Sequence, residues 1–399
     1  MLTIRDNCDA CGGPLDDVFS MGSMPLANGL LTAERLTQPG ESFPLMVAEC
    51  RRCTLAQLRY VVDPLELYRD YRFFTGASSP NAEYFETLSS WISRRTTGRR
   101  VLEIGSNDGT LLAAFEQHGF TVTGVDPAVE QCGQARLKLH HGDVHCQFWS
   151  STTAEQFQRQ FDVVVACNVL GHSNDLNDFL AGVRRVLRPS GLFVVEVQHL
   201  TALLDQAAFE LIYHEHVSYF DANSLGDLLI RNGFTVLGWE TTAAQCGTLR
   251  MWATLSGGGL TPAPCRHDWR TFRSRVESRR DHVLATIDQL QVEGRRICFY
   301  GAPAKATQLA NFWRLGPDTI AFATDTTPAK QGCWIPGAII PIVPRSHLEP
   351  TNAALVAAWN FFDQIVENEA DWIESGGKLI NPSLAGQHAL HEYNDCHSL

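Results

Sequence analysis

The stretch 100-RVLEIGSNDGTLLAAFEQHGFTVTGVDP-127 decides the fold of this 399-residue chain. It reads as a short apolar strand, a glycine-rich turn, an amphipathic helix and a second strand, which together predict a β-α-β unit. In 103-EIGSNDG-109 the glycines let the backbone approach a ligand closely, and the next helix offers free N–H groups. The pattern is not G-x-G-x-x-G, so it disfavours a dinucleotide.

Asp126 ends the second strand of this unit, where a carboxylate can bind both hydroxyls of a ribose. An acid here, combined with Glu-x-Gly-x-x-x-Gly in the turn, is the pattern of S-adenosylmethionine-dependent methyltransferases. The alternative is a nucleotide fold with a different ligand. The residues that we expect to bind the cofactor are Glu103, Gly105, Asn107, Gly109, Asp126 and Asn168.

Strands and helices continue to alternate after this unit, which predicts a doubly wound parallel sheet. Strands are expected over 161–170 and 191–200, and the helix between them, over 176–187, is stopped by Pro189-Ser190-Gly191. A turn-rich stretch, 257-GGGLTPAPC-265, then leads into a polar helix and a second strand–turn–helix, 296-RICFYGAPAKATQLANFW-313. The fold class is therefore α/β. The expected domains are a zinc-binding domain over 1–70, a Rossmann-like methyltransferase domain over 71–258 and a Rossmann-like substrate-binding domain over 259–399.

Two Cys-x-x-Cys pairs lie near the N-terminus, at Cys8 and Cys11 and at Cys50 and Cys53. Four thiolates in two such pairs are the ligands of one tetrahedral zinc ion. Because four protein ligands leave no open coordination position, we expect this zinc to be structural.

The bulk composition excludes several classes of protein. Asp and Glu number 44 against 32 Lys and Arg, and the net charge of −12 argues against non-specific affinity for nucleic acid or anionic membranes. The N-terminus lacks an apolar segment after a basic start, and no run of about 18 apolar residues occurs. We expect a cytoplasmic protein with a small-molecule substrate, and we expect a monomer.

The chain resembles the sugar C-methyltransferases that act on nucleotide-linked deoxysugars and make C-3-branched sugars for antibiotics and surface polysaccharides. The resemblance covers nearly the whole chain. It rests on the two cysteine pairs and, in this order, EIGSNDGTLL, NVLGH, YHEHVSYF, CGTLRM, YGAPAKATQLANF and DTTPAKQG. It implies the three domains given above and a 4-keto sugar substrate linked to a nucleotide, for which dTDP is the expected carrier.

Proton-transfer groups are concentrated in 212-IYHEHVSYF-220. Carbon is a poor nucleophile unless it lies next to a carbonyl and loses a proton, so C-methylation needs a base and stabilisation of the enolate. By resemblance, His216 corresponds to the family's general base, Glu215 to its acid–base neighbour and Tyr213 to a substrate-facing phenol. His172 matches a further active-site histidine, which can donate a hydrogen bond to the enolate oxygen.

Other residues of this region carry different expectations. The segment 71-YRFFTGASS-79 resembles one in which relatives have a second tyrosine near the substrate, and Phe73 takes that position here. Relatives also often have a histidine before the glycine of 245-QCG-247. These departures concern the sugar and the stereochemistry more than the reaction type. The residues expected to be structural are His214, Tyr219 and Phe220.

In the C-terminal domain, 301-GAPAKA-306 resembles the family's own signature, and Lys305 can meet the phosphates of a sugar nucleotide. Asp325 can hold a ribose hydroxyl or cap a turn. The alternative is a domain that retains a nucleotide fold and only closes over the active site.

Two other functions remain open at this stage. The first is an enzyme on the same scaffold that methylates a non-sugar ketone or works as an epimerase-like proton-transfer enzyme. The second is a binding protein with a vestigial pocket. The presence of Glu103, Gly105, Asp126 and the YHEH motif together argues against a vestigial site.

Overall fold

The structure is a computed structural model that describes residues 2–37, 40–67, 79–158, 160–242, 247–255, 258–259, 265–383 and 390–391. The chain forms two compact units. The first unit contains Met1–Asp17, Val47–Thr201 and His216–His267, and the second contains Val18–Met46, Ala202–Glu215 and Asp268–Leu399. The expected three-domain boundaries stay a prediction. Each unit combines segments that are distant in sequence.

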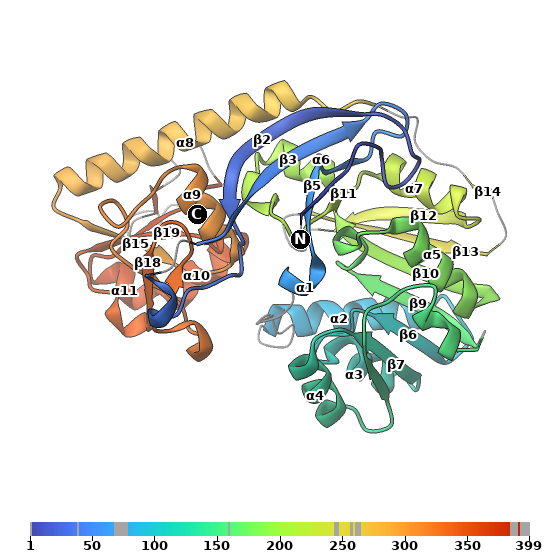
Figure 1. The fold of residues 1–399 in the computed structure, drawn as a ribbon. Helices are drawn as coiled ribbons and strands as arrows, with labels where there is room; N and C mark the ends of the chain where they lie inside the picture. The colour runs from blue at the N-terminus through green and yellow to red at the C-terminus, as the bar shows by residue number, and fades with distance from the viewer. Residues whose placement is uncertain are drawn as a thin grey trace. The chain divides into compact units, whose positions relative to one another are not determined.

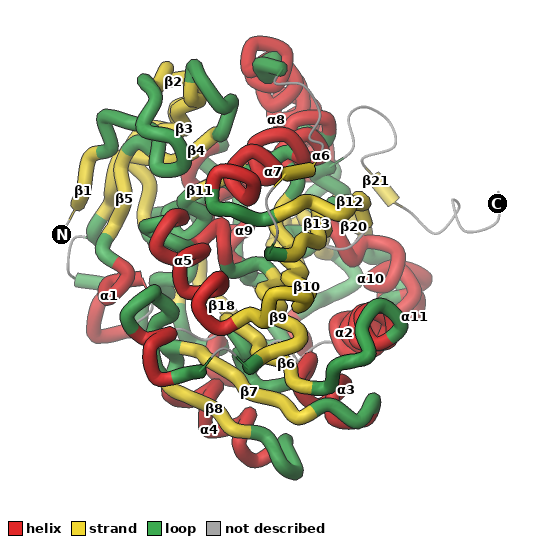
Figure 2. Tube along the Cα trace, turned by 90° about the vertical axis from the view of Figure 1, so that its right-hand side faces the viewer, coloured by secondary structure: helices red, strands yellow, loops and turns green. Residues whose placement is uncertain are grey.

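An eight-stranded sheet forms the centre of the first unit, with the order β14-β12-β13-β10-β9-β6-β7-β8 (Figure 2). Its strands are β6 (Arg100–Ile104), β7 (Thr121–Asp126), β8 (Asp143–Cys146), β9 (Phe161–Cys167), β10 (Leu187–Gln198), β12 (Thr235–Thr242), β13 (Thr248–Thr254) and β14 (Gly258–Gly259). Strands β6 to β10 pair in parallel, whereas β13 pairs antiparallel with both β10 and β12.

The order of these strands creates a switch point between β6 and β9. From β6 the chain moves outward through β7 and β8, then returns to β9 on the other side of β6 and continues to β10. In such sheets, ligands bind outside the carboxyl ends of the strands at this point. The predicted doubly wound α/β fold is confirmed.

Helices cover both faces of this sheet (Figure 2). The helices are α2 (Ser79–Ser93), α3 (Thr110–Gln117), α4 (Val129–Lys138), α5 (Leu176–Val186) and α7 (Ala222–Arg231). The strands are apolar on both sides because both faces are buried. Along β9, Val164 belongs to the same apolar cluster as Phe179 of α5, whereas Val163 and Val165 belong to the cluster that contains Phe115 of α3.

The N-terminal segment is built from short strands. Strand β1 (Leu2–Ile4) pairs with β5 (Tyr60–Val62), and a four-stranded sheet has the order β11-β4-β3-β2. The bounds of those four strands are Ser218–Tyr219 for β11, Ala56–Leu58 for β4, Ser42–Cys50 for β3 and Leu15–Pro25 for β2. Strands β2 and β3 each begin in one unit and end in the other. A short helix, α1 (Pro64–Leu67), follows β5.

The second unit contains a seven-stranded sheet with the order β17-β18-β16-β15-β19-β20-β21. The strands are β15 (Arg296–Tyr300), β16 (Ala323–Thr324), β17 (Trp334–Ile335), β18 (Ile340–Val343), β19 (Asn352–Val356), β20 (Lys378–Ile380) and β21 (Leu390–His391). The helices are α6 (Leu200–Asp205), of which Ala202–Asp205 belong to this unit, α8 (Trp269–Val292), α9 (Ala304–Phe312), α10 (Phe362–Asn368) and α11 (Ala370–Glu374). Its inner strands are parallel.

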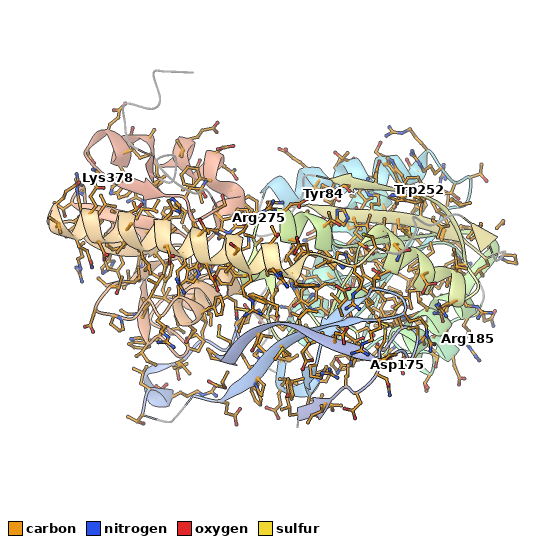
Figure 3. The ribbon with its side chains drawn as sticks, turned by 90° about the horizontal axis from the view of Figure 1, so that it is seen from above. Tyr84, Asp175, Arg185, Trp252, Arg275 and Lys378 are labelled. Carbon is orange, nitrogen blue, oxygen red and sulfur yellow. The ribbon has the colours of Figure 1, made fainter. Side chains whose placement is uncertain are left out.

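Helix α8 is the long gold helix of Figure 1, and it carries Arg275, labelled in Figure 3. Most of its buried residues are apolar and follow a helical spacing, as expected for a helix with one packed face. Arg279 is the exception, since it is buried in the same stripe and forms an ion pair with Glu210 at 2.6 Å. Within the described ranges, no helix has both the length and the apolar character needed to span a membrane.

Several expected elements have different ends in the structure. The helix expected over 176–187 ends at Val186, and Pro189-Ser190-Gly191 lie where the register of β10 is shifted, rather than in a turn. The strand expected over 161–170 ends at Cys167. A proline and a glycine are compatible with a strand at such an irregularity, because ladder hydrogen bonds are locally lost there.

Candidate active site and metal centre

The four N-terminal cysteines converge on one point of the first unit. Their sulfur atoms all lie within 4.8 Å of one another, with 3.6 Å between Cys8 and Cys53 and 3.5 Å between Cys11 and Cys50. Tetrahedral zinc with Zn–S bonds of about 2.3 Å requires sulfur atoms about 3.8 Å apart. The cluster therefore has the size and the donor atoms of a four-cysteine zinc site.

Matching turns shape the two halves of this cluster. The residue after each pair is left-handed, Gly12 with φ 67° and Thr54 with φ 60°. The sulfur of Cys50 accepts the backbone N–H of Arg52 at 3.3 Å. Burial raises the pKa of the Cys50 thiol, but the N–H groups directed at it outweigh burial and place that pKa below its ordinary value. These N–H groups favour the thiolate at Cys50, whereas burial raises the pKa of Cys11 to about 11.

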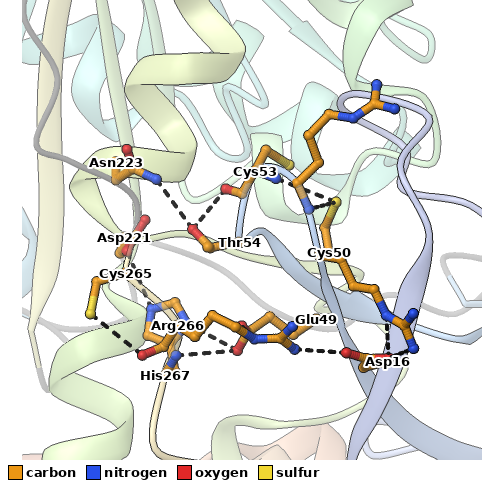
Figure 4. A network of polar contacts seen from close by, with 12 residues as sticks. Asp16, Glu49, Cys50, Cys53, Thr54, Asp221, Asn223, Cys265, Arg266 and His267 are labelled. Atoms are coloured by element: carbon orange, nitrogen blue, oxygen red, sulfur yellow. Dashed lines mark hydrogen bonds and ion pairs between the residues drawn. The ribbon is translucent and has the colours of Figure 1, made fainter.

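The second cysteine pair is joined to the rest of the first unit through polar contacts (Figure 4). Thr54 accepts a hydrogen bond from Asn223 at 3.2 Å. The imidazole of His267 lies 3.3 Å from Glu49 and 3.2 Å from Asp221. Burial lowers the pKa of His267, but these two carboxylates outweigh burial and raise it to about 9. His267 is thus a cation that ties the strand before Cys50 to the start of α7.

The glycine-rich turn after β6 has the geometry of a ligand-binding turn. Gly105, Asn107 and Gly109 all have positive φ, at 75°, 45° and 74°. The N–H of Gly105 donates to the carbonyl of Val125 at 2.7 Å, which joins the turn to β7. Asp126 accepts the N–H of Asn107 at 2.9 Å, so the acid also fixes the shape of the turn.

A buried carboxyl group lies behind this turn. Glu103 is 4% exposed, and its Oε2 has no hydrogen-bond partner among the described residues. Burial raises the pKa of Glu103 well above its ordinary value, and the charges of Asp126 and Asp108 add to the effect. A buried acid with one free oxygen at the switch point fits a cationic ligand, and S-adenosylmethionine carries both an ammonium and a sulfonium charge.

The end of β9 forms the other side of the switch point. Asn168 is left-handed, with φ 55°, and donates its N–H to the carbonyl of Glu196 at 2.8 Å. The next residue, Val169, packs against the glycine turn so closely that a Cβ on Gly105 would lie 2.1 Å from its Cγ2. The two predicted cofactor segments are therefore adjacent.

Two histidines come together just beyond β9. The rings of His172 and His216 are 4.9 Å apart and nearly perpendicular. The segments that carry them are joined by a hydrogen bond of 2.7 Å from the N–H of Val217 to the carbonyl of Gly171. Burial, with a contribution from His216, lowers the pKa of His172 to about 3. His172 is therefore neutral near pH 7 and can donate or accept a single proton.

The preceding residues of the YHEH motif belong to the second unit, because the unit boundary follows Glu215. Glu215 is 3% exposed, and both its oxygens accept from Nδ2 of Asn28, at 2.8 and 2.9 Å. Burial raises its pKa to about 7, although the Asn28 bond lowers it. His214 is buried, with a ring nitrogen 3.3 Å from the carbonyl of Phe43. Tyr213 is half-buried.

The start of the second unit's sheet repeats the geometry of the cofactor turn. Gly301 is left-handed, with φ 82°, and bonds to the strand that precedes Asp325. Asp325 accepts the N–H groups of Ala302 and Thr327 at 3.0 and 2.8 Å. In the same way, Asp126 accepts one N–H group from its turn, that of Asn107, and one from the residue two positions later in the chain, Ala128. The second unit thus has a nucleotide-type turn of its own.

Two lysines, Lys305 and Lys330, lie at this second turn, whereas the first turn has Lys138 at 3.1 Å from Asp108. Lys330 lies 3.1 Å from Asp325, and its charge and the N–H bonds outweigh burial and hold the pKa of this acid below its ordinary value. Lys305 donates to Asn360 at 2.5 Å and lies 4.7 Å from the centre of the Trp359 ring. Because Asp325 is already paired with an ammonium group and Lys305 supplies a second one, this turn is suited to an anion.

Several functional or supporting residues escaped the sequence analysis. Asn28 gave no signal, because its partner Glu215 lies 187 positions away. Glu196 did give a signal in the sequence, because it is a charged residue inside an apolar strand. It forms a buried network with Arg250 at 2.6 Å and with Tyr84 at 2.7 Å, and Tyr84 is labelled in Figure 3.

Three expectations concern other positions. Tyr219 and Phe220 are fully buried, as expected of structural residues. Phe73 lies outside the described residues, and so do positions 245 and 246, before the glycine where relatives often have a histidine.

Family models match three parts of the chain. A zinc binding domain model matches residues 8–68, a methyltransferase domain model matches 79–238, and a C-methyltransferase C-terminal domain model matches 265–383. The matched ranges include the cysteine cluster, the glycine turn with both histidines, and the lysine-bearing turn.

Individual relatives agree with these models. The chain is 33% identical over 405 residues to the C-methyltransferase NovU of Streptomyces niveus, and the match spans 94% of this chain and 95% of NovU. A ubiquinone biosynthesis O-methyltransferase of Bradyrhizobium sp. (strain ORS 278) is 36% identical over 100 residues, 25% of this chain and 40% of that protein. The solved PH0226 protein from Pyrococcus horikoshii OT3 is 20% identical, with a TM-score of 0.39 over 48% of this chain and 99% of that one, which is too low to support an argument.

Proposed function

The chain belongs to the C-methyltransferase family that includes NovU, and on this premise we propose that it methylates C-3 of a nucleotide-linked 4-keto-deoxysugar. The chain is an S-adenosylmethionine-dependent C-methyltransferase with an N-terminal zinc-binding domain. The motifs shared with sugar C-methyltransferases support a sugar as the acceptor. The two lysines beside the second unit's turn support a phosphate-bearing carrier such as dTDP.

The observation that carries this proposal is the pair formed by His172 and His216. We assign His216 as the base that removes the C-3 proton, since an imidazole can accept a proton near neutral pH. His172 is kept neutral by burial, so it can donate its N–H to the enolate oxygen. A neutral donor is suitable because it does not compete with His216 for the proton.

Glu215 and Tyr213 have supporting roles in this proposal. Glu215 is the chain neighbour of His216, and its pKa of about 7 lets it hold or release a proton in the same pH range as an imidazole. Tyr213 is half-buried, and we assign its phenol to the substrate. Phe73 is also assigned to the substrate on the resemblance alone.

The cofactor is assigned to the switch point of the first unit. The residues assigned to the cofactor from β6 and its turn are Glu103, Gly105, Asn107 and Gly109. Asp126 is assigned to the ribose, and Asn168, at the end of β9, completes the set. Asp126 keeps acceptor capacity for ribose, since each carboxylate oxygen has a second lone pair. Bound S-adenosylmethionine supplies the electrophilic methyl carbon that the enolate attacks.

The substrate phosphates are assigned to Lys305 and the turn at Gly301. The ammonium group of Lys305 is oriented by the amide of Asn360 and by the ring of Trp359. Asp325 remains a candidate for a ribose hydroxyl. Its ion pair with Lys330 makes its role in shaping the turn at least as important.

The test is to incubate the purified chain with S-adenosylmethionine and a dTDP-linked 4-keto-6-deoxysugar in deuterated water. We expect a product heavier by one methylene group, with S-adenosylhomocysteine formed in equal amount and the new methyl placed at C-3 by NMR. His216→Asn should abolish turnover while cofactor binding, measured by calorimetry, stays unchanged. Deuterium uptake by the sugar without methylation would exclude it as the methyl acceptor and favour an epimerase-like role.

A further inference from the structure

A short turn in the second unit, residues 26–29, is held in place from several sides. The N–H of Gly29 donates to the carbonyl of Leu26 at 3.1 Å, which closes the turn. The hydroxyl of Thr307, on α9, donates to the carbonyl of Ala27 at 2.9 Å in a buried contact. Just after the turn, Leu31 exchanges two backbone hydrogen bonds with Trp334, at 2.9 and 3.0 Å. The turn is therefore fixed to the C-terminal part of the second unit.

Asn28 is at the tip of this turn, and its side-chain amide donates hydrogen bonds to Glu215. One nitrogen, Nδ2, lies 2.8 Å from Oε1 and 2.9 Å from Oε2. Over the part of the chain that the structure describes, it is the one hydrogen-bond donor recorded for this carboxylate. A donor placed between both oxygens fixes the plane of the carboxylate and favours its charged form.

The rest of the side chain's surroundings points to a role beyond packing. Glu215 is buried, whereas Asn28 itself is exposed. An exposed amide that bonds to a buried acid adds little to the core. It does control the orientation and ionisation of that acid.

We propose that Asn28 is a positioning residue for methyl transfer, which holds the carboxyl group of Glu215 in a fixed orientation. The proposal rests on the function proposed above, in which Glu215 belongs to the acid–base pair. The anchored turn provides the rigidity that such a role needs, because α9 and Trp334 hold its backbone.

Two influences act on the pKa of Glu215, namely burial, which raises it, and the Asn28 bond, which lowers it. The two imidazoles next to Glu215 in the chain have other partners. His214 lies at the carbonyl of Phe43, and His216 lies against the ring of His172. Loss of the Asn28 amide should therefore move the ionisation of Glu215 to higher pH. An aspartate in place of Asn28 should raise the pKa of Glu215 further still, because a second negative charge would lie beside it.

The experiment compares wild-type chain with Asn28→Ala and Asn28→Asp. Glu215 is titrated in the full-length, substrate-free protein by ¹³C NMR of labelled glutamate, with Glu215→Gln to identify its signal. We expect the midpoint to rise from about 7 in the order wild type, Ala, Asp. With the sugar substrate, the acidic limb of the kcat profile should shift in the same order, and kcat should fall about 10- to 100-fold with little change in KM.

Asn368→Ala is the matched control, since Asn368 is an exposed asparagine at the end of α10 in the same unit. It should leave both titration and kcat unchanged. Equal Glu215 midpoints and pH profiles in wild type and variants would overturn the proposal. If Asn28→Ala does not fold, the isosteric Asn28→Asp decides alone. Failure of wild type to methylate the sugar would instead refute the proposed function, and the substrate-free titration would still test the Asn28 contact.

Discussion

Replacing Glu215 by glutamine should make the protein more stable and less active. In the folded chain the Glu215 carboxyl has a pKa of about 7, raised by burial from an ordinary value of 4.5. A group whose folded pKa is raised contributes its full stability below the unfolded pKa and loses it as pH rises through the folded one. At about pH 8 the buried, ionised Glu215 therefore destabilises the fold.

The size of the effect follows from the two pKa values. The full difference of about 2.5 pH units corresponds to roughly 3 kcal/mol, since each unit is worth about 1.4 kcal/mol. Part of this cost is already present at about pH 5, because the unfolded carboxyl has begun to ionise. When the pH rises from about 5 to about 8, we expect the free energy of unfolding of Glu215→Gln to increase by about 2 to 3 kcal/mol relative to that of wild type.

The assay is urea unfolding of both proteins at the two pH values, together with methyl-transfer rates. Titration of the other groups affects both proteins equally, so it cancels in the difference between their free energies of unfolding. Glu374→Gln serves as the control, because Glu374 is exposed in the same unit and should show no such dependence. A constant difference in unfolding free energy at both pH values would refute the reasoning, as it would mean that the carboxyl is not held protonated by burial.

Three further predictions concern the scaffold. Gly105→Ala should weaken S-adenosylmethionine binding more than tenfold by calorimetry, because its Cβ would collide with a valine methyl at 2.1 Å; Gly119→Ala, with the same positive φ but open space, should cost only about 1–2 kcal/mol of stability and spare binding. Arg279→Met should destabilise the second unit by about 3–5 kcal/mol in urea unfolding, because Glu210 stays buried without its partner; an unchanged midpoint would contradict this. Cys53→Ser, or chelation that strips the metal, should lower bound zinc from one per chain, measured by elemental analysis, and melt the N-terminal strands in circular dichroism.

The sequence was sufficient to predict the elements whose signals are local. The β-α-β unit at residues 100–127 showed its turn and its terminal acid directly, and the structure places Gly105 and Asp126 as expected. The cysteine pairs predicted one cluster because their spacing and number fit a single ion. The helix expected over 176–187 agrees with α5, Leu176–Val186, to within one residue at its end.

The tertiary structure decided which distant residues meet. His172 and His216 are 44 positions apart, and only the pairing of their backbone segments brings the rings within 4.9 Å. The same holds for the hydrogen bonds between Asn28 and Glu215, and for the ion pair between Lys330 and Asp325. Periodicity and motifs report on a residue's own strand or helix, whereas burial, pKa and contacts depend on what the rest of the chain packs around it. The sequence therefore determined the chemistry available to this protein, and the folded chain determined which groups share it.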